Sequence, residues 1–188
     1  MRGIICLAVL LLSACAHSPV PLQALPNQAR EAAAFNLNGR IAVKHQAARH
    51  SGGVRWQHQI SRDEVLLQGP LGITGARIVS NAQTASLEQG GKFYQASNVE
   101  TLMQNVLGWS LPLPVLQHWL QGRADAASPA EIERDTQGRI TLLQQAGWEV
   151  RYLRYADERT DSLPSRITLT HDDLQVQLFI DEWEFNPQ

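Results

Sequence analysis

The chain has 188 residues, which is enough for one domain with a proper hydrophobic core and marginal for two. Hydrophobic residues make up 44% of the sequence and charged residues 18%, so the composition excludes a chain that is disordered as a whole. The formal net charge is -2, which provides no strong positive field, and we expect no nucleic-acid partner. The two cysteines are Cys6 and Cys15, so residues 16–188 cannot form an internal disulfide or a cysteine-ligated zinc site.

Residues 1–15 are typical of an export signal. Arg2 supplies a positive charge, and residues 4–12 form an apolar run far shorter than the roughly 20 residues that span a bilayer. The sequence Leu-Ser-Ala-Cys at residues 12–15 resembles the bacterial lipoprotein box at all four positions. This resemblance implies cleavage between Ala14 and Cys15 and lipidation of Cys15. An ordinary secreted protein with a cysteine there by chance is the alternative.

The segment after Cys15 carries an indication of location. Residues 16–26 contain three prolines and no periodicity, which predicts a flexible tether. A short helix is predicted over residues 27–34, because Asn27 can cap a run of strong helix formers. After a lipoprotein box, Ala16 in place of an Asp implies the outer membrane. We therefore expect a lipid anchor in the periplasmic-facing inner leaflet of the outer membrane.

From residue 35 the hydrophobic pattern changes to period two, which predicts strands with one buried face. The first strand is expected over residues 35–44, and Ser-Gly-Gly at 51–53 is expected to break the chain before the second. Glycine-rich turns are expected at 69–72 and 90–91, which favours an antiparallel meander. The further strands of this half are expected over residues 54–58, 64–68, 74–80, 85–88 and 92–95.

The middle of the chain has helical spacing. Ser97 and Glu100 are placed like a capping box, and the helix that follows is expected to end at Gly108. A second short helix is expected after Pro112 and Pro114 and should stop at Gly122. Residues 123–138 are polar and are expected to form a loop.

Strands return in the last quarter of the sequence, so the order is strands, helices, strands. This order indicates an α+β chain with one highly curved antiparallel sheet and a few helices packed against it. The last strands are expected over residues 139–144, 147–152, 165–170 and 174–180, with a tight turn at 171–173.

Signatures of enzymes are missing from the sequence. It has no Gly-x-Ser-x-Gly elbow, no His-Glu-x-x-His and no P-loop, so we expect no catalysis and no cofactor. Its histidines are scattered; only His45 and His50 are close in sequence, and a solvated pair is favoured over a metal site. A lipoprotein hydrolase would need Ser51, Ser80 or Ser110 to be activated without a recognisable motif.

Leu71 is unusual because it lies at the tip of a predicted turn, where polar residues are normal. One interpretation is that the hairpin folds back and buries this side chain. The other is that Leu71, between Pro70 and Gly72, is presented to a membrane or an acyl chain. Full burial would contribute only about 1.5–3 kcal/mol, so one leucine could assist attachment but not provide it.

Six short motifs follow one another along the chain. They are Asn-Leu-Asn-Gly-Arg-Ile-Ala-Val at 36–43, Val-Arg-Trp-Gln at 54–57, Gly-Pro-Leu-Gly at 69–72, Leu-Gly-Trp-Ser-Leu-Pro at 107–112, Trp-Leu-Gln-Gly at 119–122 and Gly-Trp-Glu-Val at 147–150. Together with the lipoprotein box, this ordered set resembles the LolB family of outer-membrane lipoprotein receptors. The resemblance covers about residues 35–183.

The resemblance implies a LolA/LolB-like fold, which is an incomplete, half-open antiparallel β-barrel of about eleven strands with a helical lid. It implies residues 1–14 as lipoprotein signal peptide, 15–30 as lipidated N-terminus, tether and start of the first helix, and 31–188 as the lipid-handling domain. The family's exposed hydrophobic loop would fall at Leu71. Arg40 could point inward and contact the lid, or point outward into solvent. The side chains expected to line an acyl cavity are Leu37, Ile41, Trp56, Leu67, Met103, Val106, Trp119, Trp148 and Val150.

The implied activity is transport without covalent chemistry. A monomer would accept triacylated lipoprotein cargo from a LolA-type periplasmic carrier and insert it into outer-membrane lipid, without nucleotide hydrolysis, cofactor or metal. Three acyl chains of about 16 carbons would give roughly 35–40 kcal/mol if fully buried, above the ceiling for non-covalent binding. Partial coverage of the chains and direct transfer from mouth to mouth are therefore expected. The alternative is a structural or scaffold lipoprotein of the outer membrane with a filled core and no transfer activity.

Overall fold

The computed structural model describes residues 34–69, 72 and 74–185. They form an eleven-stranded sheet in the order β6-β5-β4-β3-β2-β1-β11-β10-β9-β8-β7, in which every neighbouring pair is antiparallel. The strands are β1 (Phe35–His45), β2 (Ala48–Gln59), β3 (Arg62–Gln68), β4 (Thr74–Ser80), β5 (Ala85–Gln89), β6 (Lys92–Ala96), β7 (Ala130–Arg134), β8 (Ile140–Gln145), β9 (Trp148–Tyr155), β10 (Pro164–His171) and β11 (Leu174–Phe185).

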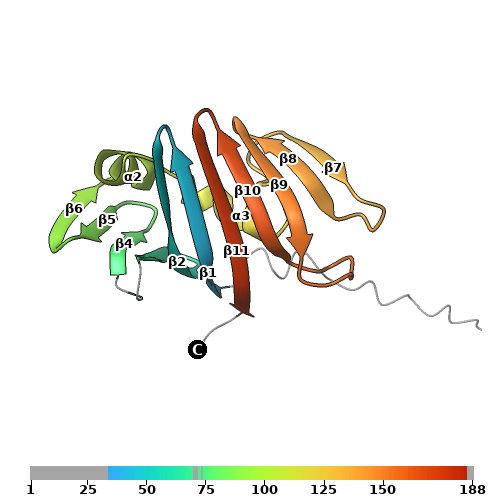
Figure 1. Cartoon of the computed structure of the whole chain (residues 1–188), viewed down its shortest axis with the longest axis horizontal. Coiled ribbons are helices and arrows are strands. Elements are labelled where there is room, and N and C mark those ends of the chain that lie inside the picture. Colours follow the sequence, from blue (N-terminus) through green and yellow to red (C-terminus); the bar gives the residue numbers. More distant parts are fainter. Residues whose placement is uncertain (1–33, 70–71, 73, 186–188) are drawn as a thin grey trace, which may run out of the picture.

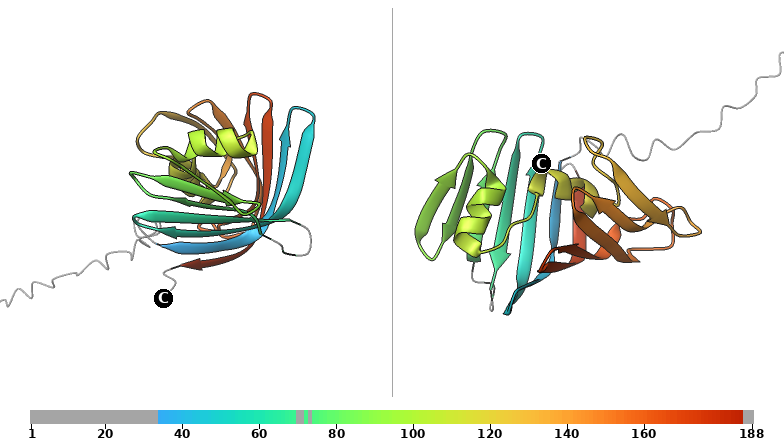
Figure 2. Two further views of the ribbon diagram at one scale, coloured as in Figure 1. Left: turned by 90° about the vertical axis from the view of Figure 1, so that its left-hand side faces the viewer. Right: turned by 90° about the horizontal axis from the view of Figure 1, so that it is seen from above.

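The sheet is curled, and the two helices lie inside its curve (Figures 1 and 2). They are α2 (Val99–Leu107) and α3 (Leu113–Leu120), which follow one another between β6 and β7. The two outermost strands, β6 and β7, do not pair with each other, so the barrel stays open. The predicted α+β class, the half-open antiparallel barrel and the helical lid are therefore confirmed.

The centre of the sheet is formed by the first and last strands. Ile41 of β1 lies opposite Leu178 of β11, and Val43 lies opposite Val176, with all four side chains buried on the concave face. The ladder has a bulge at Gly39, where a Cβ atom would come within 2.1 Å of the Phe179 carbonyl oxygen. The period-two alternation of β1 thus has its physical origin in one buried face.

The predicted break at residues 51–53 is wrong, because β2 runs through it without interruption. Gly52 is paired with Ile41 inside the ladder, and a Cβ atom on it would lie 1.9 Å from the carbonyl oxygen of Gln68. Glycine is therefore needed for the close approach of the end of β3, and its presence does not end the strand.

The helix ends are set by local capping. The capping residue of α2 is Asn98 and not Ser97 as expected, since the Asn98 Oδ1 atom accepts a hydrogen bond of 2.8 Å from the Thr101 amide. The helix ends at Gly108, as predicted, with a left-handed φ of 80°. Helix α3 begins directly after Pro112, and its C-terminal cap is Gln121.

Residues 123–138 are not entirely a loop, because they include the edge strand β7. This strand pairs only with β8 and has no buried face, so it lacks the alternation by which strands are recognised. The predicted helix over residues 27–34 lies outside the described residues except for Ala34, which is in neither a helix nor a strand. Neither described helix has the length and apolar character that crossing a bilayer requires.

Candidate functional site

An apolar space lies between the concave face of the sheet and the helices. Its volume is about 30 Å³, which is room for about one water molecule, so the helices pack closely over the sheet. The lining side chains are all hydrophobic, and they are Leu37, Ile41, Val54, Trp56, Val65, Leu67, Ile78, Met103, Trp109, Leu111, Leu113, Leu116, Leu120 and Leu178.

A larger cavity of about 460 Å³ adjoins this inner space and opens to solvent. The two share Ile41, Leu67 and Trp109, so the open cavity lies directly beside the apolar interior. Its volume falls in the range of about 300–1,000 Å³ that is usual for ligand sites. We call this open cavity the mouth; its polar edge includes Arg49 and His50 of β2.

Three glycines lie in the wall of the mouth, where strands β2, β3 and β4 approach one another closely. Gly52 and Gly53 come from β2, and Gly75 comes from β4. At Gly75 a Cβ atom would lie 3.4 Å from the Leu67 carbonyl oxygen, and at Gly52 it would collide with the backbone of Gln68. The opposite wall is formed by Val106, Leu107 and Trp109 at the end of α2 and just after it. These contacts put the C-terminal end of α2 at the entrance.

Helix α3 is attached to the sheet by the buried side chain of Gln145 on β8. The Gln145 Oε1 atom accepts hydrogen bonds from Trp119 Nε1 at 2.8 Å and from the Asp125 amide at 2.9 Å. The Gln145 Nε2 group donates to the carbonyl oxygens of Asp125 and Ser128, at 2.7 and 2.8 Å. All four hydrogen-bonding positions of this amide are therefore used.

Two tyrosines of β9 donate hydrogen bonds on the same side, one to α3 and one to β8. The Tyr152 hydroxyl donates to the Trp119 carbonyl oxygen at 2.8 Å, and the Tyr155 hydroxyl donates to the Ile140 carbonyl oxygen at 2.6 Å. Burial raises the pKa of Tyr155 to about 12, and it raises the pKa of Tyr152 further. Both hydroxyls thus remain neutral donors at physiological pH.

Most of the side chains expected to line an acyl cavity come together in the structure. Leu37, Ile41, Trp56, Leu67 and Met103 line the inner space. Val106 lines the mouth, as do Ile41 and Leu67.

Trp119, Trp148 and Val150 line neither the inner space nor the mouth. Trp119 is fully buried where α3 meets the sheet, and Val150 is fully buried in the core. Trp148 packs its ring 5.0 Å from that of His171 and borders two other pockets, of about 300 and 430 Å³. Trp119 of α3 and Trp148 and Val150 of β9 are therefore part of the packed core and not of the cavity wall.

Of the two orientations left open for Arg40, the structure shows the outward one, without contact to the lid. Arg40 alternates with the inward-facing Ile41, so its side chain lies on the convex face, where it is 65% exposed. Its guanidinium forms an ion pair of 3.1 Å with Asp181 and lies 5.3 Å from the centre of the Phe179 ring. The alternative of an outward, solvated Arg40 is the one observed.

Several expected site residues are not among those that the structure describes. Ala14, Cys15, Pro70 and Leu71 lie outside the described residues. Gly72 is described; it is exposed, has a φ of 74°, and its amide donates a hydrogen bond of 3.3 Å to the Gly69 carbonyl oxygen. Because Gly69 also lines the mouth, the loop that contains Leu71 starts at the entrance.

Sequence reasoning missed the contribution of α3 and the segment before it. Leu113, Leu116 and Leu120 recur with helical spacing, and this pattern could have identified one apolar helix face turned toward the sheet. No group of three or more histidine, cysteine, aspartate or glutamate side chains is arranged to hold a metal ion within residues 34–69, 72 and 74–185.

Comparison with known proteins adds an independent observation. Residues 33–183 match a family model described as outer membrane lipoprotein LolB. A protein of Azoarcus sp. strain BH72 named outer-membrane lipoprotein LolB is 39% identical over 98% of this chain and 95% of its own length. A protein of the same name from Thiobacillus denitrificans is 35% identical over 90% of this chain and 89% of its own length.

Among solved structures, the crystal structure of a LolA superfamily protein from Nitrosomonas europaea is similar in fold. The TM-score is 0.53 at 11% sequence identity, and the match covers 84% of this chain and 88% of the other. This likeness supports the architecture of a curled sheet around helices.

Proposed function

The chain belongs to the outer membrane lipoprotein LolB family, and on this basis we propose that it is a lipoprotein receptor of the outer membrane. It receives lipoproteins from a LolA-type periplasmic carrier and delivers them to the membrane. The observation that carries the proposal is the wholly apolar interior that continues into an open mouth. Acyl chains are the ligand class that such an interior accommodates, because its lining is hydrophobic throughout and the charged Arg49 lies only at the edge of the mouth.

The cargo must enter by displacing side chains. The interior of about 30 Å³ is too small for an acyl chain, whereas the mouth of about 460 Å³ can take the first part of one. Helix α3 is held by Gln145, while α2 packs on β5 and β6 and ends at the mouth. We infer that α2 moves away from the sheet as cargo enters.

Energetics require direct contact between carrier and receptor. Each CH₂ group brought out of water contributes about 0.8 kcal/mol, so passage of acyl chains through water is strongly unfavourable. The direction of transfer needs only a modest difference in affinity, since about 1.4 kcal/mol is tenfold. The transfer therefore proceeds by binding alone, as a monomer, without catalysis or nucleotide.

The proposed roles of the N-terminal segment rest on the family and on the lipoprotein box at residues 12–15. Residues 1–14 form the lipoprotein signal peptide, residues 15–30 the lipidated N-terminus and tether, and residues 31–188 the lipid-handling domain. Acyl chains on Cys15 anchor the protein in the periplasmic-facing inner leaflet of the outer membrane. Leu71, Pro70 and Gly72 form the loop that enters the membrane during delivery.

The proposal is tested with the lipidated chain in vesicles and a LolA-type carrier loaded with a labelled lipoprotein. Val106→Asp places a charge in the mouth and should reduce transfer at least about tenfold, because a buried unpaired carboxylate costs several kcal/mol. Asn105→Asp adds the same charge on the exposed side of α2 and should transfer like the wild type. Label that stays on the carrier with the folded wild type would instead favour a scaffold protein.

A further inference from the structure

Two cations stand directly opposite one another on the convex face of the sheet. Lys44 of β1 is paired in register with Arg49 of β2, and both side chains are exposed. Like charges in this position destabilise a sheet. Among the described residues, neither side chain forms an ion pair. The repulsion between the two cations is therefore not offset by an ion pair within the described residues.

The acidic residues nearest along the sheet are occupied elsewhere. Asp173 and Asp172 belong to the turn between β10 and β11, beside the β1–β2 hairpin. The Asp173 carboxylate lies 3.3 Å from His45 Nε2, and the Asp172 carboxylate lies 3.3 Å from His171 Nδ1. The charge of Lys44 and Arg49 is therefore available to an external anion.

A groove of about 450 Å³ surrounds the two cations. Its polar lining adds only uncharged groups beside them, from Ser51, Gln175 and Gln177, together with His50. Hydroxyl and amide groups of this kind donate hydrogen bonds to phosphate oxygens and do not repel them.

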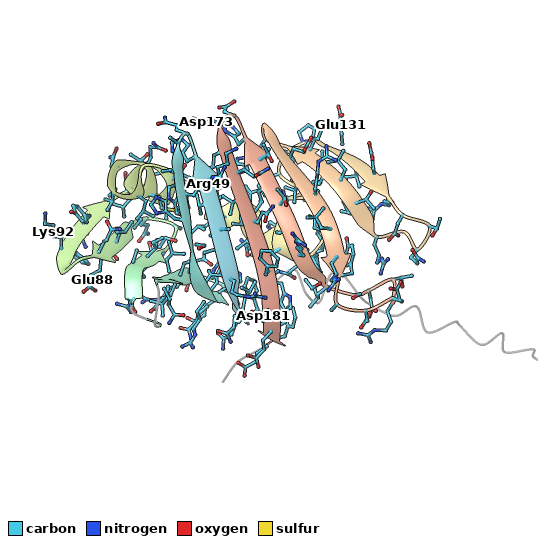
Figure 3. All side chains as sticks on the ribbon, in the orientation of Figure 1. Arg49, Glu88, Lys92, Glu131, Asp173 and Asp181 are labelled. Carbon is cyan, nitrogen blue, oxygen red and sulfur yellow. The ribbon has the colours of Figure 1, made fainter. Side chains whose placement is uncertain are left out.

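The groove adjoins the mouth of the apolar cavity. Arg49, His50 and Ser51 line both, and this part of β2 extends past the end of β3, so the groove and the mouth meet along one exposed stretch of strand. The antiparallel order also puts the β1–β2 and β3–β4 connections on one rim of the sheet. In Figure 3, Arg49 lies in the upper part of the sheet, on the side of the β1–β2 turn, and Asp181 lies near the bottom.

We propose that Lys44 and Arg49 form a binding site for the phosphate of membrane phospholipids, which docks the mouth onto the bilayer. The groove and the mouth together present a phosphate site next to an acyl site. A phospholipid is the ligand in which these two groups are covalently joined. The proposal rests on the proposed function for the approach of the mouth to the membrane, and it adds a headgroup contact to it.

The test follows the β1–β2 hairpin at a membrane. The full mature chain, with its lipid anchor, carries a fluorophore on Ala47→Cys at the hairpin turn. It is reconstituted in vesicles that contain phosphatidylglycerol with a nitroxide in the headgroup region, and quenching reports docking. Lys44→Gln/Arg49→Gln should lower the docking equilibrium about 30-fold, because each cation near an anionic bilayer contributes about fivefold.

The matched control is Arg40→Gln/Arg55→Gln, which removes the same charge from the same convex face. Both of these arginines already have partners, Asp181 and Asn38. An equal loss of docking in both double variants would overturn the proposal, because it would mean attraction by net charge alone.

Two further outcomes would also overturn it. One is undiminished quenching in vesicles of a galactolipid that has no phosphate. The other is a label that responds only to the carrier, which would make the groove a protein-docking surface. Cargo uptake from the carrier is measured in the same samples, so a failure of the receptor function is seen separately from a failure of docking.

Discussion

Gln145 is a buried polar side chain on which two parts of the molecule depend. It is 3% exposed and joins β8 to Trp119 of α3 and to the segment that begins at Asp125. A buried group that loses its partner costs about 1–3 kcal/mol, whereas a satisfied network stabilises one arrangement. Gln145 thus provides most of the side-chain hydrogen bonds at this end of α3, beside the one that Tyr152 donates.

Replacing Gln145 should lower the stability of the fold. Gln145→Ala leaves the Trp119 indole and the Asp125 amide without an acceptor, so we expect the free energy of unfolding to fall by about 2–4 kcal/mol. Urea denaturation measures this change. Gln144→Ala is the control, since Gln144 is exposed on the same strand and should change stability by less than about 0.5 kcal/mol. Equal effects of the two substitutions would contradict the role assigned to Gln145.

The two helices are held to the sheet in different ways. Helix α3 is tied by buried hydrogen bonds, whereas α2 is defined by the cap at Asn98 and by the left-handed glycine at Gly108. The Gly108 amide donates to the Gln104 carbonyl oxygen, and Gln104 Nε2 donates back to the Gly108 carbonyl oxygen at 3.1 Å. The end of α2 at the mouth therefore depends on one backbone conformation.

Gly108→Ala should loosen this end. An L-residue in the left-handed region costs about 1–2 kcal/mol, and no neighbouring atom lies within 4 Å of the added Cβ, so the effect is conformational and not steric. We expect amide hydrogen exchange of α2 to become about fivefold to thirtyfold faster. Gly138→Ala introduces the same strain in the β7–β8 turn, at a φ of 81°, and should leave α2 exchange unchanged relative to global stability.

The elements that sequence could predict are those with one buried face. β1 and β11 were placed correctly at their starts because Phe35, Leu37, Ile41 and Val43 alternate with polar residues. β7 was missed because its side chains face solvent on both sides. The predicted break at Gly52 is wrong because the sequence does not distinguish a glycine required by close backbone approach from one that forms a turn.

At the scale of the whole molecule, the cavity could be predicted only in part. Alternation identifies which side chains face the concave side, but it does not distinguish a packed core from a cavity. Trp148 and Val150 therefore fit the alternating pattern, yet they line neither the inner space nor the mouth. Trp109 does line the mouth, although it lies in the segment between the two helices. The expectation that the cavity binds acyl chains came from the family resemblance and not from the hydrophobic pattern.

Delivery should be separable from uptake. Leu71→Glu is expected to accept cargo from the carrier and to deliver it to vesicles about tenfold to a hundredfold more slowly, since burial of one leucine contributes about 1.5–3 kcal/mol. Transfer of labelled cargo measures both steps. Ile60→Glu is the control, because Ile60 is 86% exposed in the β2–β3 turn, on the opposite rim of the sheet. A defect in uptake by Leu71→Glu would contradict the role of this loop.

The pairing of β1 with β11 determines when the sheet can be completed during folding. Phe35 lies opposite Phe185, so the central ladder of the sheet joins strands from the two ends of the domain. Contacts of such long sequence separation form slowly, because a large loop must close first. The sheet cannot be completed until the last strand has been made. Until then the edge of β1 that pairs with β11 stays unpaired, so the hairpins of the two halves can form but cannot be joined at the centre of the sheet.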